Sequence, residues 1–216
     1  CRHLDWDFSQ QELGWTWQTT REDEKVRWNL LADLPLCHIP LANAATALAA
    51  IQKLPFEISL EIVKKSLLEV ELTGRFQTMK PESLTHLSQM IQREVKALPR
   101  VIVDVGHNPH AARYLAEKLT ALKAQSQGKL IAVCGILKDK DAVGVLTPLL
   151  PLVDEWRCVT LGGYRGQRGE DLFVTLQQIA TQHHLNAQGS YADSVAEGGK
   201  SAVEMANKND TVLVFG

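Results

Sequence analysis

The strongest constraint on the fold is an alternation of apolar runs with amphipathic segments, which starts after residue 74 and continues to residue 216. The runs of strand length are RVIVDV (100–105), KLIAVCG (129–135), EWRCVTL (155–161) and TVLVFG (211–216). The segments expected to be helical are 83–96, 109–122, 141–150, 170–183 and 194–207. Apolar strands separated by helices are typical of a parallel sheet between helical layers. We therefore predict an α/β fold over residues 73–216: a Rossmann-like, mostly parallel sheet with helices on both faces.

The first 72 residues have a different pattern. ELGWTWQT (12–19) alternates with the period of a strand, and VRWNLL (26–31) offers it a partner, so we predict a small antiparallel sheet. One helix is expected from Asn43, and another from Ser59, whose hydroxyl suits an N-cap. The residues expected on the buried face of the second helix are Leu60, Val63, Leu67 and Leu68. Residues 1–72 are therefore expected to form a separate, small α+β unit.

The composition argues against several classes of protein. Of the 216 residues, 45% are hydrophobic and 22% charged, and the net charge of −2 argues against a nucleic-acid binder or a polybasic membrane-surface protein. We find no apolar run near the roughly 18 residues that span a bilayer, and no signal-peptide pattern. The cysteines (Cys1, Cys37, Cys134 and Cys158) are scattered and form no CxxC pair, which is typical of a reducing compartment. We expect a cytoplasmic protein with neither a nucleic-acid nor a membrane partner.

The most informative stretch for chemistry is the turn that follows the run at 100–105. Asp104 ends the expected strand, His107 and Asn108 follow it, and Pro109 stands where a helix would begin. Ligands of open parallel sheets bind at the carboxyl ends of strands, where a helix N-terminus also offers N–H groups to an anion. Asp104 could accept hydrogen bonds from ribose hydroxyls, and His107 could face a phosphate or an acyl group. The alternative is structural: Asp104 and Asn108 cap the turn, and His107 is a surface residue.

The sequence has neither of the two common phosphate-binding signatures. The turn reads G-H-N-P-H-A rather than G-x-G-x-x-G, and no G-x-x-x-x-G-K-[ST] segment occurs. These residues alone therefore predict neither a dinucleotide site nor a complete triphosphate site.

Four short motifs occur in a fixed order: Asn43-Ala-Ala-Thr-Ala, Gly74-Arg-Phe-Gln, DVGHNPHAA (104–112) and GILKDKD (135–141). Together they resemble the bacterial bifunctional dihydrofolate synthase/folylpolyglutamate synthases of the Mur ligase family. The resemblance extends from residue 1 to residue 216. It implies that residues 1–72 are the end of a central ATPase domain, and that residues 73–216 are most of a Mur ligase C-terminal domain.

The resemblance implies an ATP- and Mg²⁺-dependent ligase of folate and one-carbon metabolism. In that family, ATP phosphorylates the carboxylate of dihydropteroate or of a folate's terminal glutamate, and the amine of L-glutamate then displaces phosphate. The implied site residues are Asn43 beside the adenine, Arg75 on the ATP phosphates, Asp104 at the ribose, and His107 near the reacting phosphate and the glutamate. A guanidinium suits its role because it binds two phosphate oxygens at once. The resemblance also implies a monomer.

A structural interpretation remains open for several of these residues. Asn43 could simply be a helix N-cap, and Arg75 could be a surface residue of a strand. The run at 138–141 could be a solvated loop in which Asp141 caps the following helix.

Some features depart from the family pattern. Gly106 stands where the family usually has alanine, and residues 83–96 are expected to be an insertion that packs beside the sheet. The family's phosphate-binding loop, Mg²⁺ ligands and carbamylated lysine are expected upstream of residue 1, and a serine segment of the glutamate site after residue 216. We therefore interpret the sequence as a fragment that does not catalyse ligation by itself.

Other functions remain as alternatives. A peptidoglycan-precursor ligase of the same superfamily would use the same chemistry on a nucleotide-sugar peptide. A non-catalytic nucleotide-binding or interaction module is the alternative from a different class. A nicotinamide-dependent dehydrogenase is disfavoured because the glycines of its fingerprint are missing.

Overall fold

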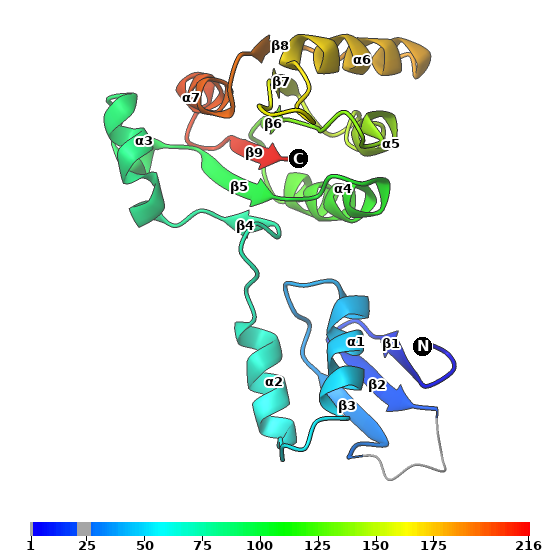
Figure 1. Ribbon diagram of the computed structural model, residues 1–216. Coiled ribbons are helices and arrows are strands. Elements are labelled where there is room, and N and C mark those ends of the chain that lie inside the picture. The colour runs from blue at the N-terminus through cyan, green and yellow to red at the C-terminus, as the bar shows by residue number, and fades with distance from the viewer. Residues whose placement is uncertain (1, 21–26) are drawn as a thin grey trace. The chain divides into compact units, whose positions relative to one another are not determined.

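The computed structural model describes residues 2–20 and 27–216. The chain divides into two compact units, residues 1–73 and residues 74–216, which we call unit 1 and unit 2 (Figure 1). Among the described residues, every helix is too short or too polar to cross a membrane.

Unit 1 contains the predicted antiparallel sheet. Its strands are β1 (Trp6–Gln10), β2 (Trp15–Thr19) and β3 (Leu30–Leu34), in the order β1-β2-β3. The alternation in β2 places Trp15 and Trp17 on one face, where both are fully buried. Each donates its indole N–H to a backbone carbonyl, Trp15 to Pro35 at 2.9 Å and Trp17 to Ala45 at 3.1 Å, so their burial leaves no unpaired donor. The part of the predicted partner strand before residue 27 lies outside the described residues.

The first helix of unit 1, α1 (Leu41–Ile51), corrects one prediction. Its N-cap position is occupied by Pro40, whose fixed φ of −55° suits a helix start, and no side chain caps it. Asn43 is the third residue of the helix and is exposed, so its interpretation as the N-cap is wrong.

The second helix of unit 1, α2 (Leu60–Glu69), begins as predicted. Ser59 is its N-cap, and the hydroxyl accepts a hydrogen bond from the backbone N–H of Ile62 at 3.3 Å. Val63 and Leu67 are buried, whereas Leu68 is 60% exposed, so its predicted place on the buried face is wrong. The buried stripe is therefore narrower than predicted.

Unit 2 is built on a six-stranded sheet with the order β4-β5-β9-β6-β7-β8. The strands are β4 (Gln77–Thr78), β5 (Arg100–Asp104), β6 (Leu130–Cys134), β7 (Glu155–Val159), β8 (Gly189–Ala192) and β9 (Thr211–Phe215). All neighbouring pairs are parallel except β4 with β5. The four predicted strands are confirmed. The sequence did not predict the two edge strands, because β4 has only two residues and β8 lacks an apolar run.

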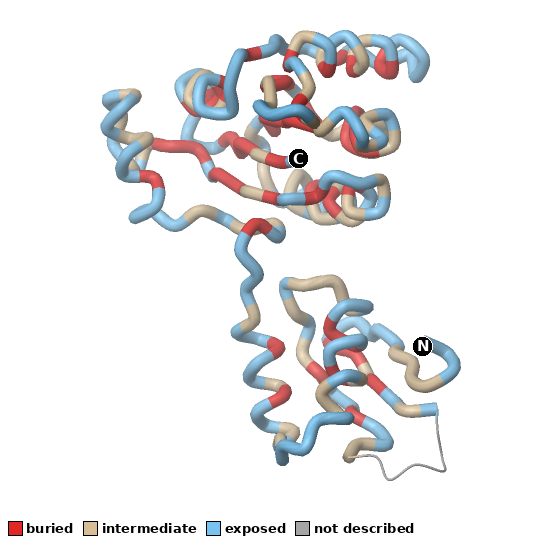
Figure 2. Tube along the Cα trace, in the orientation of Figure 1, coloured by how far each residue is buried: buried red, intermediate tan, exposed pale blue. Residues whose placement is uncertain are grey.

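Helices cover both faces of this sheet, as predicted (Figure 1). One face carries α4 (Pro109–Ala124), α5 (Ala142–Leu146) and α6 (Gly169–Gln182). The other carries α7 (Val195–Met205) and the short elements η1 (Pro81–Leu84), α3 (Thr85–Met90) and η2 (Val95–Ala97). The buried residues follow the strands and the inward sides of these helices (Figure 2). The sheet therefore has an apolar core on each face, which explains its continuous apolar strands.

The segment 83–96 is not the single helix that its periodicity predicted. The expected apolar stripe, Leu84, Leu87, Ile91 and Val95, does pack against the α7 side of the sheet. However, α3 ends at Met90, and Gln92 has a positive φ of 53°. Arg93 explains the break, because its guanidinium donates hydrogen bonds to carbonyl groups in and just after the last turn of α7, at 2.7–3.1 Å. Tertiary contacts thus override the local helical pattern.

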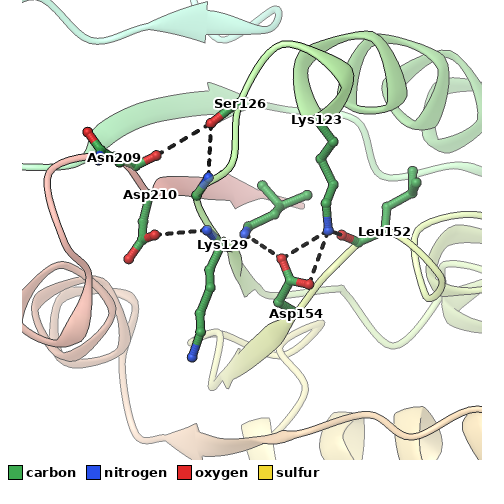
Figure 3. A network of polar contacts seen from close by, with 9 residues as sticks. Lys123, Ser126, Lys129, Leu152, Asp154, Asn209 and Asp210 are labelled. Atoms are coloured by element: carbon green, nitrogen blue, oxygen red, sulfur yellow. Dashed lines mark hydrogen bonds and ion pairs between the residues drawn. The ribbon is translucent and has the colours of Figure 1, made fainter.

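The amino ends of β6, β7 and β9 are held together by two carboxylates (Figure 3). Asp154 accepts hydrogen bonds from the backbone N–H of Leu130 at 2.7 Å and from Lys123 Nζ. Asp210 is 6% exposed and accepts from the backbone N–H of Lys129 at 2.8 Å and of Asn207 at 2.7 Å. The polar side chains at this edge of the sheet therefore stabilise the fold by connecting the ends of neighbouring strands.

The buried cysteines lead to a first prediction. Cys134 and Cys158 are partners on β6 and β7 with their sulfur atoms 3.8 Å apart, and the hydrogen bond between them, together with burial, raises the pKa of the Cys134 thiol well above its usual range. Both sulfur atoms are fully buried, and the thiolate that reacts is further disfavoured at Cys134, so we expect neither thiol to react with iodoacetamide at pH 8 in the folded chain, while both react in urea. Half-buried Cys37 is the internal control. Mass spectrometry of labelled peptides measures the result, and equal labelling of Cys134 with and without urea would contradict it.

Candidate functional site

The candidate site of unit 2 lies at the carboxyl ends of the parallel strands. β4 pairs with β5, so the turn that precedes β4 lies beside the end of β5. This pairing brings Arg75, Asp104 and His107 to one edge of the sheet, the edge at which open parallel sheets bind ligands. Asn43 lies in unit 1, exposed on the first turn of α1.

Asp104 is the buried centre of this group and is 8% exposed. Its Oδ2 accepts a hydrogen bond from the backbone N–H of Phe76 at 2.8 Å, and its Oδ1 accepts one from the backbone N–H of Gly106 at 2.7 Å. Asp104 therefore has the structural role that the alternative interpretation gave it, because both of its carboxylate oxygens accept hydrogen bonds from backbone N–H groups. Each carboxylate oxygen has two lone pairs, so acceptor capacity remains on both.

Arg75 projects from a tightly held turn and does not lie within a strand. Gly74, with a φ of 69°, accepts a hydrogen bond from the backbone N–H of Val105 at 2.8 Å and donates its own N–H to Gln77 Oε1 at 2.9 Å. A Cβ on Gly74 would lie 2.8 Å from Val105 Cγ1, so this close approach requires glycine. Arg75 is exposed and has no hydrogen bond or ion pair with a described residue of its unit. Arg75 therefore presents a guanidinium that has no partner among the described residues of unit 2, on a backbone that is held in place.

His107 is exposed in the turn after β5, with a defined ring orientation. Its Nδ1 lies 3.0 Å from the carbonyl oxygen of Val105. A carbonyl only accepts, so Nδ1 carries the proton and Nε2 is directed away from this bond. In the neutral ring, Nε2 therefore has a free lone pair, which can accept a proton or bind a donor.

The start of α4 completes this turn. Asn108 is the N-cap, and its side-chain oxygen accepts a hydrogen bond from the backbone N–H of Ala111 at 3.0 Å. Pro109 is the first helical residue, as predicted. The capping role expected for Asn108 is confirmed.

Two further loops at the same edge are joined by an ion pair that the sequence analysis missed. Arg165, after β7, donates to both carboxylate oxygens of Asp139, after β6, at 3.0 and 2.6 Å. The backbone N–H of Lys138 also donates to the Arg165 carbonyl at 3.0 Å. The residues of such a contact are 26 positions apart, so no local spacing pattern indicates it.

The loop after β6 also meets the start of α4. Asp141 caps α5 by accepting a hydrogen bond from the backbone N–H of Gly144 at 2.8 Å, which confirms its predicted capping role. A Cβ on Gly144 would lie 2.7 Å from Pro109 Cγ. The start of α5 therefore lies against the start of α4, close to the turn that carries His107.

The Asp139–Arg165 pair leads to a second prediction. The hydrogen bonds from Arg165 hold the pKa of the Asp139 carboxyl below its ordinary value of 3.8. Arg165→Gln should raise that pKa, because the charged donor is lost. The pair stabilises the fold above the ordinary pKa, and this contribution is lost as the pH falls through the lowered value. NMR titration of the Asp139 carboxyl measures the shift. Lys140→Gln is the control, since Lys140 Nζ lies 4.0 Å away; an equal pKa in both variants would contradict the prediction.

The described part of the chain contains no cluster of metal-binding side chains. Among residues 2–20 and 27–216, no group of three or more His, Cys, Asp or Glu side chains is placed to hold a metal ion. Asp104 and His107 therefore do not form a metal centre with a third such ligand in this part of the chain.

Comparison with known proteins gives consistent matches. The family model described as "Mur ligase, glutamate ligase domain" matches residues 88–216. A curated dihydrofolate synthase/folylpolyglutamate synthase of Haemophilus influenzae is 54% identical over 215 residues, covering 100% of this chain and 47% of that protein.

Solved structures match the chain in the same way. E. coli FolC in complex with DHPP and ADP aligns with a TM-score of 0.75 and 34% identity, covering 99% of this chain and 43% of that one. A bifunctional folylpolyglutamate synthase/dihydrofolate synthase with Mn, AMPPNP and L-glutamate bound aligns with a TM-score of 0.71 and 36% identity, covering 99% of this chain and 43% of that one. The present chain thus spans less than half the length of these relatives.

Proposed function

This chain belongs to the Mur ligase family, and on that premise we propose that the full-length protein joins L-glutamate to dihydropteroate or to a folate in an ATP-dependent reaction. The relatives reported above support the choice of substrates, since their names and ligands include dihydrofolate synthase, folylpolyglutamate synthase, DHPP, ADP and L-glutamate. We further propose that the full-length protein is a monomer and that it is located in the cytoplasm.

The observation that carries the proposal is the exposed Arg75 guanidinium, which has no described partner in its unit and lies in the turn beside the end of β5. The His107 imidazole lies in the turn that follows β5. In the proposed reaction the γ-phosphoryl group of ATP moves to the substrate carboxylate, giving an acyl phosphate and ADP. The amine of L-glutamate then forms the amide bond and displaces inorganic phosphate. A cation on a fixed backbone and a proton acceptor with a defined ring orientation are the two groups that these steps need from this edge.

Each predicted site residue has a place in this scheme. Arg75 binds phosphate oxygens in a bidentate manner, because its planar fork matches their geometry. His107 is the proposed catalytic residue, with Nε2 accepting the proton that the ammonium group of L-glutamate must lose before attack. Asp104 offers its remaining lone pairs to the ribose hydroxyls, and Asn43 binds the adenine from unit 1.

Mg²⁺ is proposed as the metal that accompanies ATP, because it neutralises phosphate charge in such reactions. From the family resemblance, we propose that its protein ligands lie in the part of the full-length protein that this chain does not cover.

The test is glutamate-dependent release of phosphate by the full-length protein with ATP and Mg²⁺. Three parallel reactions contain dihydropteroate, tetrahydrofolate or no acceptor. Release with both acceptors supports a bifunctional enzyme, and release with one assigns the activity to that substrate. Absence of release with either, from folded protein that binds ATP, would contradict the proposal and favour a peptidoglycan-precursor substrate or a non-catalytic module.

A further inference from the structure

We infer that Asp104 is a positioning residue, which fixes the backbone next to Arg75 and the backbone next to His107 with one carboxylate. This inference rests on the proposed function for the roles of Arg75 and His107. It goes beyond a contact with ATP, because it assigns Asp104 an action through two other side chains.

The hydrogen bonds of Asp104 carry the inference. Phe76 directly follows Arg75, and its backbone N–H donates to Oδ2 at 2.8 Å. Gly106 directly precedes His107, and its backbone N–H donates to Oδ1 at 2.7 Å. The carboxylate therefore joins a segment before β4 to the turn after β5, and Asp104 itself lies 28 positions along the chain from Phe76. Hydrogen bonds to a charged carboxylate are among the stronger ones in proteins.

The backbone conformation at Phe76 supports this role. Phe76 has a φ of 46°, a left-handed value that residues with a Cβ rarely adopt. Its ring packs against the core on the α4 side of the sheet, so the residue is held by its side chain as well as its N–H. Strained backbone of this kind persists only where surrounding contacts over-determine it, and the Asp104 hydrogen bond is one of these contacts.

A contact with ribose as the sole role of Asp104 would have a different signature. A ribose contact and a phosphate contact by Arg75 would contribute independently, so that the effects of removing each would multiply. A positioning role requires that the part of the Asp104 effect that acts through Arg75 disappears when Arg75 is already absent, while the part that acts through His107 remains, so the combined loss is smaller than the product of the two single losses. A double-mutant cycle separates these two cases.

The experiment uses Asp104→Asn and Arg75→Ala, singly and together, in the full-length protein. Asparagine keeps the size of the side chain but replaces one acceptor oxygen by an NH₂ group, so one backbone N–H loses its acceptor. Asp104→Asn should lower kcat/KM for ATP by about 100-fold, the effect expected from a small misplacement of catalytic groups. In the Arg75→Ala background, the same substitution should lower it by less than about tenfold.

Asp210→Asn is a matched control. Asp210 is similarly buried and also accepts two backbone N–H groups at 2.7–2.8 Å, but it lies at the amino edge of the same sheet (Figure 3). It should disturb the fold about as much as Asp104→Asn and leave kcat/KM for ATP within about twofold of the wild type. Equal losses of activity in both variants would overturn the inference, because the effect would then be a general loss of stability.

A second measurement requires no activity. Amide hydrogen exchange of the nucleotide-free protein should become faster at Phe76 or Gly106 in Asp104→Asn, but not in Asp210→Asn. Unchanged exchange at both residues, or multiplicative losses in the cycle, would overturn the positioning role. An inactive wild-type protein would instead contradict the proposed function, and the exchange rates would still test the anchoring.

Discussion

Arg75→Ala in the full-length protein should lower kcat/KM for ATP by about 10²–10³-fold, the usual effect of removing one group that stabilises charge in a transition state. The reason is that the guanidinium is exposed, has no described partner in its unit, and projects from a turn held by hydrogen bonds of Gly74 and Phe76. No other described contact of Arg75 is lost by the substitution, so the fold should be unaffected. Steady-state kinetics with varied ATP measure the effect.

Two further variants sharpen this result. Arg75→Lys keeps the charge but loses the planar fork, so it should recover only part of the activity. Arg100→Ala is the control, because Arg100 is also exposed but lies at the amino end of β5, away from the candidate site. If Arg75→Ala matched the wild type, Arg75 would be an ordinary surface arginine.

Trp156→Ala should lower the free energy of unfolding of unit 2 by about 3–5 kcal/mol, because it empties a large volume in the core. Trp156 is fully buried on β7 and makes an edge-on contact with Phe215 of β9, with ring centroids 6.5 Å apart. With an m-value near 2 kcal/mol/M, the urea midpoint of unit 2 should fall by about 2 M. Circular dichroism measures this transition.

The chain supplies its own controls for this experiment. The other tryptophans all lie in unit 1: Trp6, Trp15, Trp17 and Trp28. Tryptophan fluorescence of Trp156→Ala therefore follows unit 1, whose transition should not move. Trp156→Phe should cost at least about 1 kcal/mol less than alanine, because it fills much of the space. Both substitutions remove a buried indole N–H that has no hydrogen-bond partner among the described residues, so this loss does not distinguish them. Equal midpoints for the two variants would contradict this account.

The strands of unit 2 differ in how far the sequence predicts them. β5, β6, β7 and β9 lie between two helical layers, so most of their residues are apolar and the signal is strong, although β7 also contains Glu155 and Arg157. β8 is a partly exposed edge strand with the sequence Gly-Ser-Tyr-Ala, which has no such signal. The break in the segment 83–96 depends on Arg93 reaching the end of α7, a contact more than 100 positions away along the chain. Buried strands can therefore be predicted from the sequence. Edge strands, and hydrogen bonds from a distant side chain to the end of a helix, cannot.

The candidate site shows the same division. The turn after β5 pointed to Asp104 and His107 because a polar turn between an apolar strand and a helix is a local pattern. The hydrogen bond from Phe76 to Asp104 and the pair of Arg165 with Asp139 depend on strand order and loop placement. Local sequence contains no information on either, so the structure was needed to find the groups that hold the site together.

The position of β9 has a consequence for biosynthesis. β9 lies between β5 and β6, yet it is the latest strand of the sheet to be translated. Until residues 211–215 leave the ribosome, β5 and β6 each lack the neighbour with which they share a full set of parallel hydrogen bonds. Neither strand can complete its backbone pairing until this distant segment is available. Their apolar residues stay exposed for longer as a result, which makes the nascent chain prone to aggregation. Completion of the sheet of unit 2 therefore depends on the release of residues 211–215 from the ribosome, and chaperones that bind extended apolar segments have their main opportunity before β9 is inserted.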